Sequence, residues 1–178
     1  MSDFKYKHGL CVMRAQPFHI GHQKLVNQML IDCAYVTIAL GSIQEQGTDK
    51  NPFDYATRRK MIENIYQSKP EYNRLKIIGL SDINNPSEWG TFVLEIIKEK
   101  FPELPLPEAY YAGSEEDADW FKSCCAHIEL VDRYDPNFPL VSATMVRNLI
   151  KSGDNRWKNF VASENHQLIE SKFRSLMK

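Results

Sequence analysis

Two histidines, His19 and His22, lie in the segment Arg-Ala-Gln-Pro-Phe-His-Ile-Gly-His, residues 14–22. Side chains at this spacing share one face of a helix, so both imidazoles would point the same way. Such a pair is suited to capping a helix, to donating hydrogen bonds to an anion, or to forming half of a metal site. A zinc site needs three or four ligands, and no second paired motif exists among the remaining histidines. The sequence therefore gives little support for a metal.

The residues around this pair predict a strand, a tight loop and a helix. Residues 9–13 are an apolar run short enough for a buried strand, and apolar residues recur at helical spacing over 25–33. Pro17 disfavours helical backbone angles at Gln16, and Gly21 has no side chain to keep a ligand from the backbone. Unpaired N–H groups and the positive end of a helix dipole are expected to face outward here, which predicts an anion site.

A second segment whose residues could bind a ligand is Val-Ser-Ala-Thr-Met-Val-Arg, residues 141–147. Ser142 or Thr144 can cap the helix predicted to follow. Arg147, about one turn further along, can present a planar fork of donors to phosphate oxygens.

The remaining elements predict one α/β domain. Further strands are expected at residues 35–40, 75–80, 109–112 and 127–131, and further helices from residues 51–54, from Pro86 and over 115–125. Strands that alternate with helices form a parallel sheet through right-handed crossovers. We therefore expect a Rossmann-like parallel five-stranded sheet with helices on both faces. Residues 1–150 would form this core, and residues 151–178 a small helical C-terminal segment of the same domain.

Two side chains in the middle of the chain have two interpretations each. Arg58 falls on the inward stripe of its helix, where a buried charge needs a partner; an ion pair, or contact with a ligand phosphate or a site loop, would provide one. Trp89 lies on an apolar stripe, which favours a place in the core. It also lies in the first turn after a strand, where open α/β sheets bind ligands, and there a tryptophan can stack on a ring.

Composition limits the class of protein. The chain has 178 residues with 22 Lys and Arg against 23 Asp and Glu, so it lacks the basic excess of a general nucleic-acid binder. No run approaches the roughly 18 apolar residues of a membrane span, and the first residues lack a signal-peptide core. The four cysteines fit no zinc, redox or disulfide spacing. We expect a cytoplasmic protein with reduced cysteines and no membrane or nucleic-acid partner.

Together the two motifs resemble the nucleotidyltransferase superfamily that contains the cytidylyltransferases and the adenylyltransferases of NAD, coenzyme A and flavin synthesis. His-Ile-Gly-His also occurs in class I aminoacyl-tRNA synthetases, but these are far longer and carry a Lys-Met-Ser-Lys-Ser loop that is absent here. Residues 41–45, 51–62 and 82–89 are similar to the archaeal-type nicotinamide-nucleotide adenylyltransferases. The resemblance covers roughly residues 9–165.

The resemblance implies a role for each matching residue. The catalytic groups holding the ATP phosphates would be His19, His22 and Arg147. Further ATP contacts would come from Arg14, Gln16, Gly21, Gly113, Ser142 and Thr144. The nicotinamide mononucleotide (NMN) pocket would comprise Asn51, Pro52, Phe53, Asp82, Asn84 and Trp89, with Lys50 and Arg58 in support. On this basis Trp89 stacks on nicotinamide, which reverses the core interpretation. Mg²⁺ would be held by the ATP phosphates and not by side chains, and relatives of this kind form homo-oligomers.

Some positions depart from the family pattern. Met13 and Ala15 stand where the family usually has glycine and an aromatic residue, and the arginine run after the second motif is reduced to Arg147. No Nudix signature follows, so the second activity of bifunctional relatives is not expected. Two alternatives stay open: another acceptor (phosphopantetheine, flavin mononucleotide or a phospho-alcohol, with ATP or CTP), or a nucleotide-binding module without catalytic activity.

Overall fold

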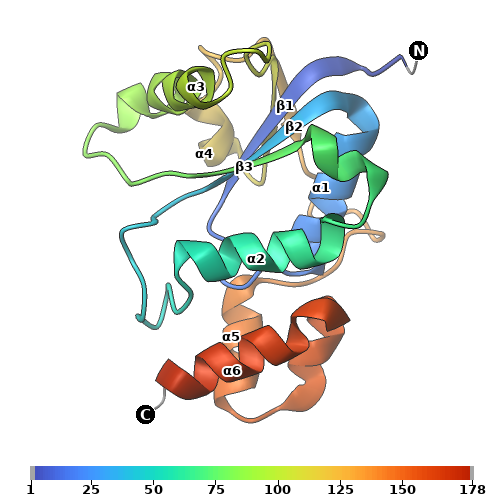
Figure 1. Cartoon of the computed structure of the whole chain (residues 1–178), viewed down its shortest axis with the longest axis vertical. Helices are drawn as coiled ribbons and strands as arrows, with labels where there is room; N and C mark the ends of the chain where they lie inside the picture. The colour runs from blue at the N-terminus through green and yellow to red at the C-terminus, as the bar shows by residue number, and fades with distance from the viewer. Residues whose placement is uncertain (1–2, 177–178) are drawn as a thin grey trace.

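Five parallel strands form a single sheet in the order β3-β2-β1-β4-β5 (Figure 1). The structure, a computed structural model, describes residues 3–176. The strands are β1 (Tyr6–Met13), β2 (Cys33–Leu40), β3 (Leu75–Gly79), β4 (Ala109–Ala112) and β5 (His127–Leu130). Met13 pairs with Leu40, and Leu40 with Gly79, so three strands end at one level. The predicted five-stranded parallel sheet is confirmed.

Helices cover both faces of the sheet, as expected (Figure 1). They are α1 (Ile20–Asp32), α2 (Tyr55–Tyr66), α3 (Trp89–Lys100), α4 (Glu115–Asp119), α5 (Ala143–Lys151) and α6 (His166–Leu176). Short 3₁₀ helices occupy Pro70–Arg74, Pro86–Glu88, Asn155–Phe160 and Ser163–Asn165.

Helix α4 is shorter than the predicted span of residues 115–125. After Asp119 the chain continues as turns, in which the Phe121 N–H donates to the Ala118 carbonyl. This turn stacks Phe121 on Tyr110, with 3.8 Å between ring centroids. It also brings the Trp120 carbonyl against Gly90 of α3, where a Cβ would lie 2.2 Å from that oxygen. Packing against the sheet and against α3 therefore ends the helix early.

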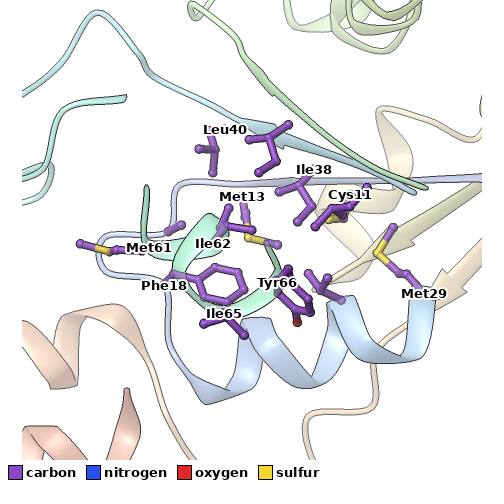
Figure 2. Close-up of a cluster of buried hydrophobic side chains, with 14 of the residues drawn as sticks. Cys11, Met13, Phe18, Met29, Ile38, Leu40, Met61, Ile62, Ile65 and Tyr66 are labelled. Atoms are coloured by element: carbon purple, nitrogen blue, oxygen red, sulfur yellow. The ribbon is translucent and has the colours of Figure 1, made fainter. Parts of the chain in front are cut away.

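Two hydrophobic cores flank the sheet. The larger lies between the sheet and helices α1 and α2, where side chains from all these elements meet around Phe18 and Tyr66 (Figure 2). The smaller lies under α3 and the α4 turn and includes Val93 and Phe121. Full burial of side chains this size contributes about 1.5–3 kcal/mol each to stability. The two cores therefore stabilise the sheet from both of its faces.

The C-terminal segment packs on α2. The Asn165 side chain is fully buried and donates to the Met61 carbonyl at 2.9 Å, while Asn64 donates to Asn165 Oδ1 at 3.0 Å. Phe173 of α6 contacts Phe53, with 5.6 Å between ring centroids. Figure 1 shows α5 and α6 below the sheet and beside α2.

The strand order reverses at β1. The chain builds β2 and β3 on one side of β1 and then returns to place β4 on the other. Loops that leave β1 and β4 therefore diverge, and open α/β sheets bind ligands in the resulting crevice. Within residues 3–176, no helix is long and apolar enough to cross a membrane.

Candidate active site

His19 and His22 lie at this crevice, where α1 begins. His19 caps the helix: its Nδ1 accepts from the N–H of Gly21 at 3.2 Å and of His22 at 3.4 Å, and its own N–H donates to His22 Nδ1 at 3.3 Å. The two rings stack with centroids 3.7 Å apart. Because each Nδ1 accepts a hydrogen bond, a neutral ring carries its proton on Nε2. The pair thus offers two Nε2–H donors.

The environment keeps both rings neutral. Burial, aided by the nearby charge of Arg133, lowers the pKa of His19 to about 4. Burial also lowers the pKa of His22, and His19 and Arg133 add to that effect. At neutral pH the pair therefore donates hydrogen bonds without carrying charge.

The expected row of unpaired N–H groups at the start of α1 is wrong in part. The Gly21 and His22 N–H groups donate to the His19 ring instead of facing outward. Capping uses Nδ1 and leaves Nε2 for a ligand. The capping interpretation and the donor interpretation of the histidines are therefore compatible.

Three adjoining pockets form one cleft along the carboxyl ends of the strands. The outer pocket, about 460 Å³, includes His19, Arg133, Tyr134 and Ser142. The central cleft, about 370 Å³, includes Arg14, His22, Gly113 and Arg133. The aromatic pocket, about 280 Å³, is lined by Asp82, Trp89, Tyr110, Asp117, Trp120 and Phe121. Adjacent pockets share His22 and Gly113 on one side and Trp89 on the other, so a ligand can span all three.

Eight of the residues singled out from the sequence line this cleft. They are Arg14, His19, Gly21, His22, Gly113, Ser142 and, at the far end, the pair Asp82 and Trp89. Ser142 also caps α5, accepting from the Met145 N–H at 3.1 Å. Trp89 is half-buried and faces both the central cleft and the aromatic pocket.

Gln16 and Arg147 are buried and Thr144 is exposed, and none of the three is among the residues that line the cleft. Arg147 is buried; it donates to the Gln16 carbonyl at 2.8 Å and to Thr144 Oγ1 at 3.2 Å. The Gln16 side chain exchanges two hydrogen bonds with the Phe53 backbone, at 2.8 and 2.9 Å. Gln16 therefore connects the first motif, the second motif and the loop at residues 51–53.

The predicted NMN set is divided by the structure. Asn51, Pro52 and Phe53 are buried, and Pro52 and Phe53 face a separate pocket of about 240 Å³ beside α6. Asn84 lines an outer groove along α3, and Lys50 is exposed on the preceding loop. Of the six, only Asp82 and Trp89 line the cleft.

Arg58 joins the ends of two central strands. Its side chain is fully buried, and its Nη1 donates to the carbonyls of Arg14 and Gly41, each at 2.8 Å. The next residues, Ala15 and Ser42, have φ of 51° and 52°, values that residues other than glycine rarely adopt. The ion pair considered for Arg58 is not formed within residues 3–176; contact with the site loop is what the structure contains.

Asp82 closes the β2 end of the cleft. Both carboxylate oxygens accept from Ser42 Oγ, at 2.8 and 3.0 Å, and one also accepts from Gln44 Nε2 at 2.8 Å. The left-handed backbone of Ser42 aims its hydroxyl at Asp82 across two loops, so the strain at that residue positions a carboxylate in the cleft.

Arg133, Asp117 and Trp120 are cleft residues that the sequence analysis missed. Arg133 follows β5 and lies across Gly113, where an added Cβ would be 2.4 Å from its Nη2. Asp117 and Trp120 follow β4. The rule that ligands bind beyond the carboxyl ends of strands could have identified all three, but none of them belongs to a sequence motif.

The cleft offers no dedicated metal centre within the described chain. Residues 3–176 contain no group of three or more His, Cys, Asp and Glu side chains placed to hold an ion.

A parallel sheet with paired donors and arginines at its switch point defines an α/β protein that binds phosphorylated nucleotides. A family model described as Cytidylyltransferase-like matches residues 11–164. The chain belongs to this family of nucleotidyltransferases, which confirms the resemblance carried by the two motifs.

Curated relatives cover most of the chain. The nicotinamide-nucleotide adenylyltransferase of Thermococcus kodakarensis is 28% identical over 156 residues, covering 87% of this chain and 78% of that protein. The enzyme of the same name from Saccharolobus solfataricus is 29% identical over 162 residues, covering 90% and 88%.

A solved structure has the same fold. The bifunctional NMN adenylyltransferase/ADP ribose pyrophosphatase of Francisella tularensis, crystallised with AMP and a manganese ion, superposes with a TM-score of 0.74 at 22% identity. The match covers 96% of this chain and 49% of that one, so this chain spans about half of the bifunctional protein.

Proposed function

We propose that this protein joins ATP and NMN to form NAD and pyrophosphate. The observation that carries the proposal is the stacked imidazole pair at the switch point, whose Nε2 atoms have no hydrogen-bond partner within residues 3–176 and which lies next to a tryptophan-lined pocket. The names of the curated relatives support the same substrates.

The reaction is an in-line attack by the NMN phosphate on the α-phosphorus of ATP. One P–O bond forms, and the bond from the α-phosphorus to the bridging oxygen breaks, with the electron pair leaving on pyrophosphate. Because a phosphate monoester has a second pKa of about 6, the nucleophile is already largely ionised at neutral pH. Catalysis then depends on alignment and on stabilising the charge that develops.

The chain supplies three kinds of stabilisation. His19 and His22 donate from Nε2, Arg14 and Arg133 add positive charge in the central cleft, and Arg147 holds the loop through the Gln16 carbonyl. Mg²⁺, entering as the MgATP complex, would neutralise part of the phosphate charge; its ligands would be ATP oxygens and water.

The test is pyrophosphate release from MgATP, with NMN, phosphopantetheine and flavin mononucleotide as parallel acceptors. Selective release with NMN is the expected result. Release with another acceptor would assign a different reaction within the family, and ATP binding without release with any acceptor would indicate a nucleotide-binding module.

A further inference from the structure

Arg58 is a buried charge without a counter-ion. Its side chain is fully buried, and no carboxylate within residues 3–176 forms an ion pair with it. Its Nε and Nη2 atoms also lack a hydrogen-bond partner among these residues. Burying an unpaired charge and unpaired donors lowers stability, and an apolar side chain of similar size would avoid both costs. Fold stability alone therefore does not account for an arginine at this position.

The remaining nitrogen of Arg58 connects the ends of two strands. Nη1 donates to the carbonyl of Arg14, which follows β1, and to the carbonyl of Gly41, which follows β2, both at 2.8 Å. Both of these residues line the central cleft, and Arg58 does not. Arg58 therefore contacts the wall of the cleft through main-chain atoms.

Each bonded carbonyl precedes a residue in the left-handed conformation. Ala15 has φ of 51° and Ser42 has φ of 52°, and in residues with a side chain this conformation is disfavoured by about fivefold to thirtyfold. The angle φ is the rotation about the N–Cα bond, and the preceding carbonyl fixes the peptide plane from which that rotation starts. Hydrogen bonds from a charged donor are strong enough to offset this cost.

The two left-handed residues control how side chains are placed around the cleft. Arg14 precedes Ala15 and His19 follows it, so a rotation at Ala15 would change the position of one relative to the other. The Ser42 hydroxyl donates to both carboxylate oxygens of Asp82, at 2.8 and 3.0 Å. A rotation at Ser42 would therefore move the group that holds Asp82 in the cleft.

We propose that Arg58 is a positioning residue, which holds Ala15 and Ser42 in the left-handed conformation and thereby sets the relative positions of Arg14, His19 and Asp82. The inference rests on the proposed function, because it concerns the same cleft. A displacement of about 1 Å at a reacting group can cost about 100-fold in rate. Loss of the two Arg58 bonds should therefore lower kcat/KM by about 10-fold to 100-fold.

The experiment compares kcat/KM for MgATP in the wild type, Arg58→Met, Arg58→Lys and Arg59→Met, well below their melting temperatures. Methionine keeps much of the side-chain length without a donor, and lysine keeps a charged donor that is one bond shorter. Arg58→Met should show the full loss and Arg58→Lys a smaller one; if Arg58→Met does not fold, Arg58→Lys carries the test. Arg59 is the matched control, because it is the next residue of α2, is partly exposed and pairs with Glu63 at 2.8 Å. Arg59→Met should change kcat/KM by less than about threefold.

Ala15→Gly distinguishes a positioning role from a purely structural one. Glycine adopts positive φ without a steric cost, so a loop that has lost the Arg58 bonds returns to the left-handed conformation more readily. In the Ala15→Gly background the loss caused by either Arg58 variant should be smaller, by about fivefold for Arg58→Met. A purely structural role predicts no such recovery, because glycine lowers stability further.

Binding of MgATP without an acceptor, measured by calorimetry, provides a readout that is independent of turnover. Because Arg58→Met lowers the fraction of chains with a competent cleft, the Kd for MgATP should rise by about fivefold or more. Ala15→Gly should reduce this rise as well.

The outcomes separate the positioning role from the reaction. Unchanged kcat/KM in the folded Arg58 variants, or a loss that Ala15→Gly leaves intact, overturns the positioning role while the reaction stands. A wild type that binds MgATP without turnover, with the expected changes of Kd in the variants, upholds the positioning role and overturns the reaction. A wild type without turnover whose Kd for MgATP is unaffected by Arg58→Met overturns both.

Discussion

His19 caps α1 with one ring nitrogen and offers the other to a ligand, and substitution can separate these functions. Asparagine is also a favourable N-cap residue, but it is too short to place a donor where Nε2 lies. His19→Asn should therefore keep the melting temperature near the wild-type value and lower turnover by about 10²–10³-fold, the cost of losing one transition-state donor. His19→Ala should lose the cap as well, at about 1 kcal/mol. Near-normal turnover in His19→Asn would remove His19 from the chemistry.

The lowered pKa of His19 also predicts a pH dependence of stability. An unfolded chain binds a proton at His19 below its ordinary pKa of about 6.5, whereas the folded chain resists it until about pH 4. The stabilisation is complete above pH 6.5 and is lost as pH falls towards 4, by up to about 1.4 kcal/mol per pH unit. Urea unfolding at pH 7, 6 and 5 should show a steeper decline for the wild type than for His19→Asn. Equal slopes would contradict the assignment.

The side chains that sequence patterns place well are those with a periodic or local cause. The inward position of Arg58 and the capping by Ser142 follow from helical spacing and from the residue types that cap helices. The carbonyl partners of Arg58 could not be predicted, because Arg14 and Gly41 end two different strands. Arg133 comes close to Gly113 only because β4 and β5 pair, which no local pattern predicts.

At the scale of elements, Gln16 connects segments that the sequence keeps far apart. It bonds the backbone of Phe53, and its carbonyl accepts from Arg147 of α5. Gln16→Ala would leave the buried Phe53 N–H and carbonyl unpaired, at about 1–3 kcal/mol for each group. We expect urea unfolding to show a loss of that order and the KM values for both substrates to rise together. Gln28→Ala, which removes an exposed side chain bonded to Asp32, is the matched control and should stay within about 0.5 kcal/mol. A change in one KM alone would argue against the connection.

The hydrogen bonds between Gln16 and Phe53 indicate a supporting role for residues 51–53, which the resemblance did not imply. Their burial and their bonds to Gln16 put them behind the cleft, where they can position the first loop. Family patterns identify which residues matter near a site, but they do not distinguish a contact from a support. The structure makes that distinction through Gln16, and the direct NMN role of these residues stays a prediction.

At the scale of the whole molecule, the order of elements was predictable and the packing of the C-terminal segment was not. Alternation of strands and helices prescribes a parallel sheet. Helical spacing in residues 151–178 says only that the segment is helical. Its contact with α2 depends on the buried Asn165, a polar residue that no apolar pattern places in a core.

Asn165 therefore tests whether the C-terminal segment and the sheet unfold as one unit, as the single-domain prediction requires. Asn165→Ala removes two hydrogen bonds, one to the Met61 carbonyl and one from Asn64, although that carbonyl keeps its helical bond within α2. The loss should cost about 1–3 kcal/mol and lower the melting temperature by roughly 2–4 °C per kcal/mol. Exposed Asn148 on α5 provides a control that should change little. Trp89→Phe and Trp120→Phe provide a background in which Trp157 is the one remaining tryptophan and reports on the segment. Circular dichroism reports on the whole chain, and one cooperative unit requires the two transitions to coincide with and without Asn165→Ala. A fluorescence transition that precedes the loss of helix would mean that the C-terminal segment unfolds before the sheet. The sheet and α1 alone would then be enough to form the cleft.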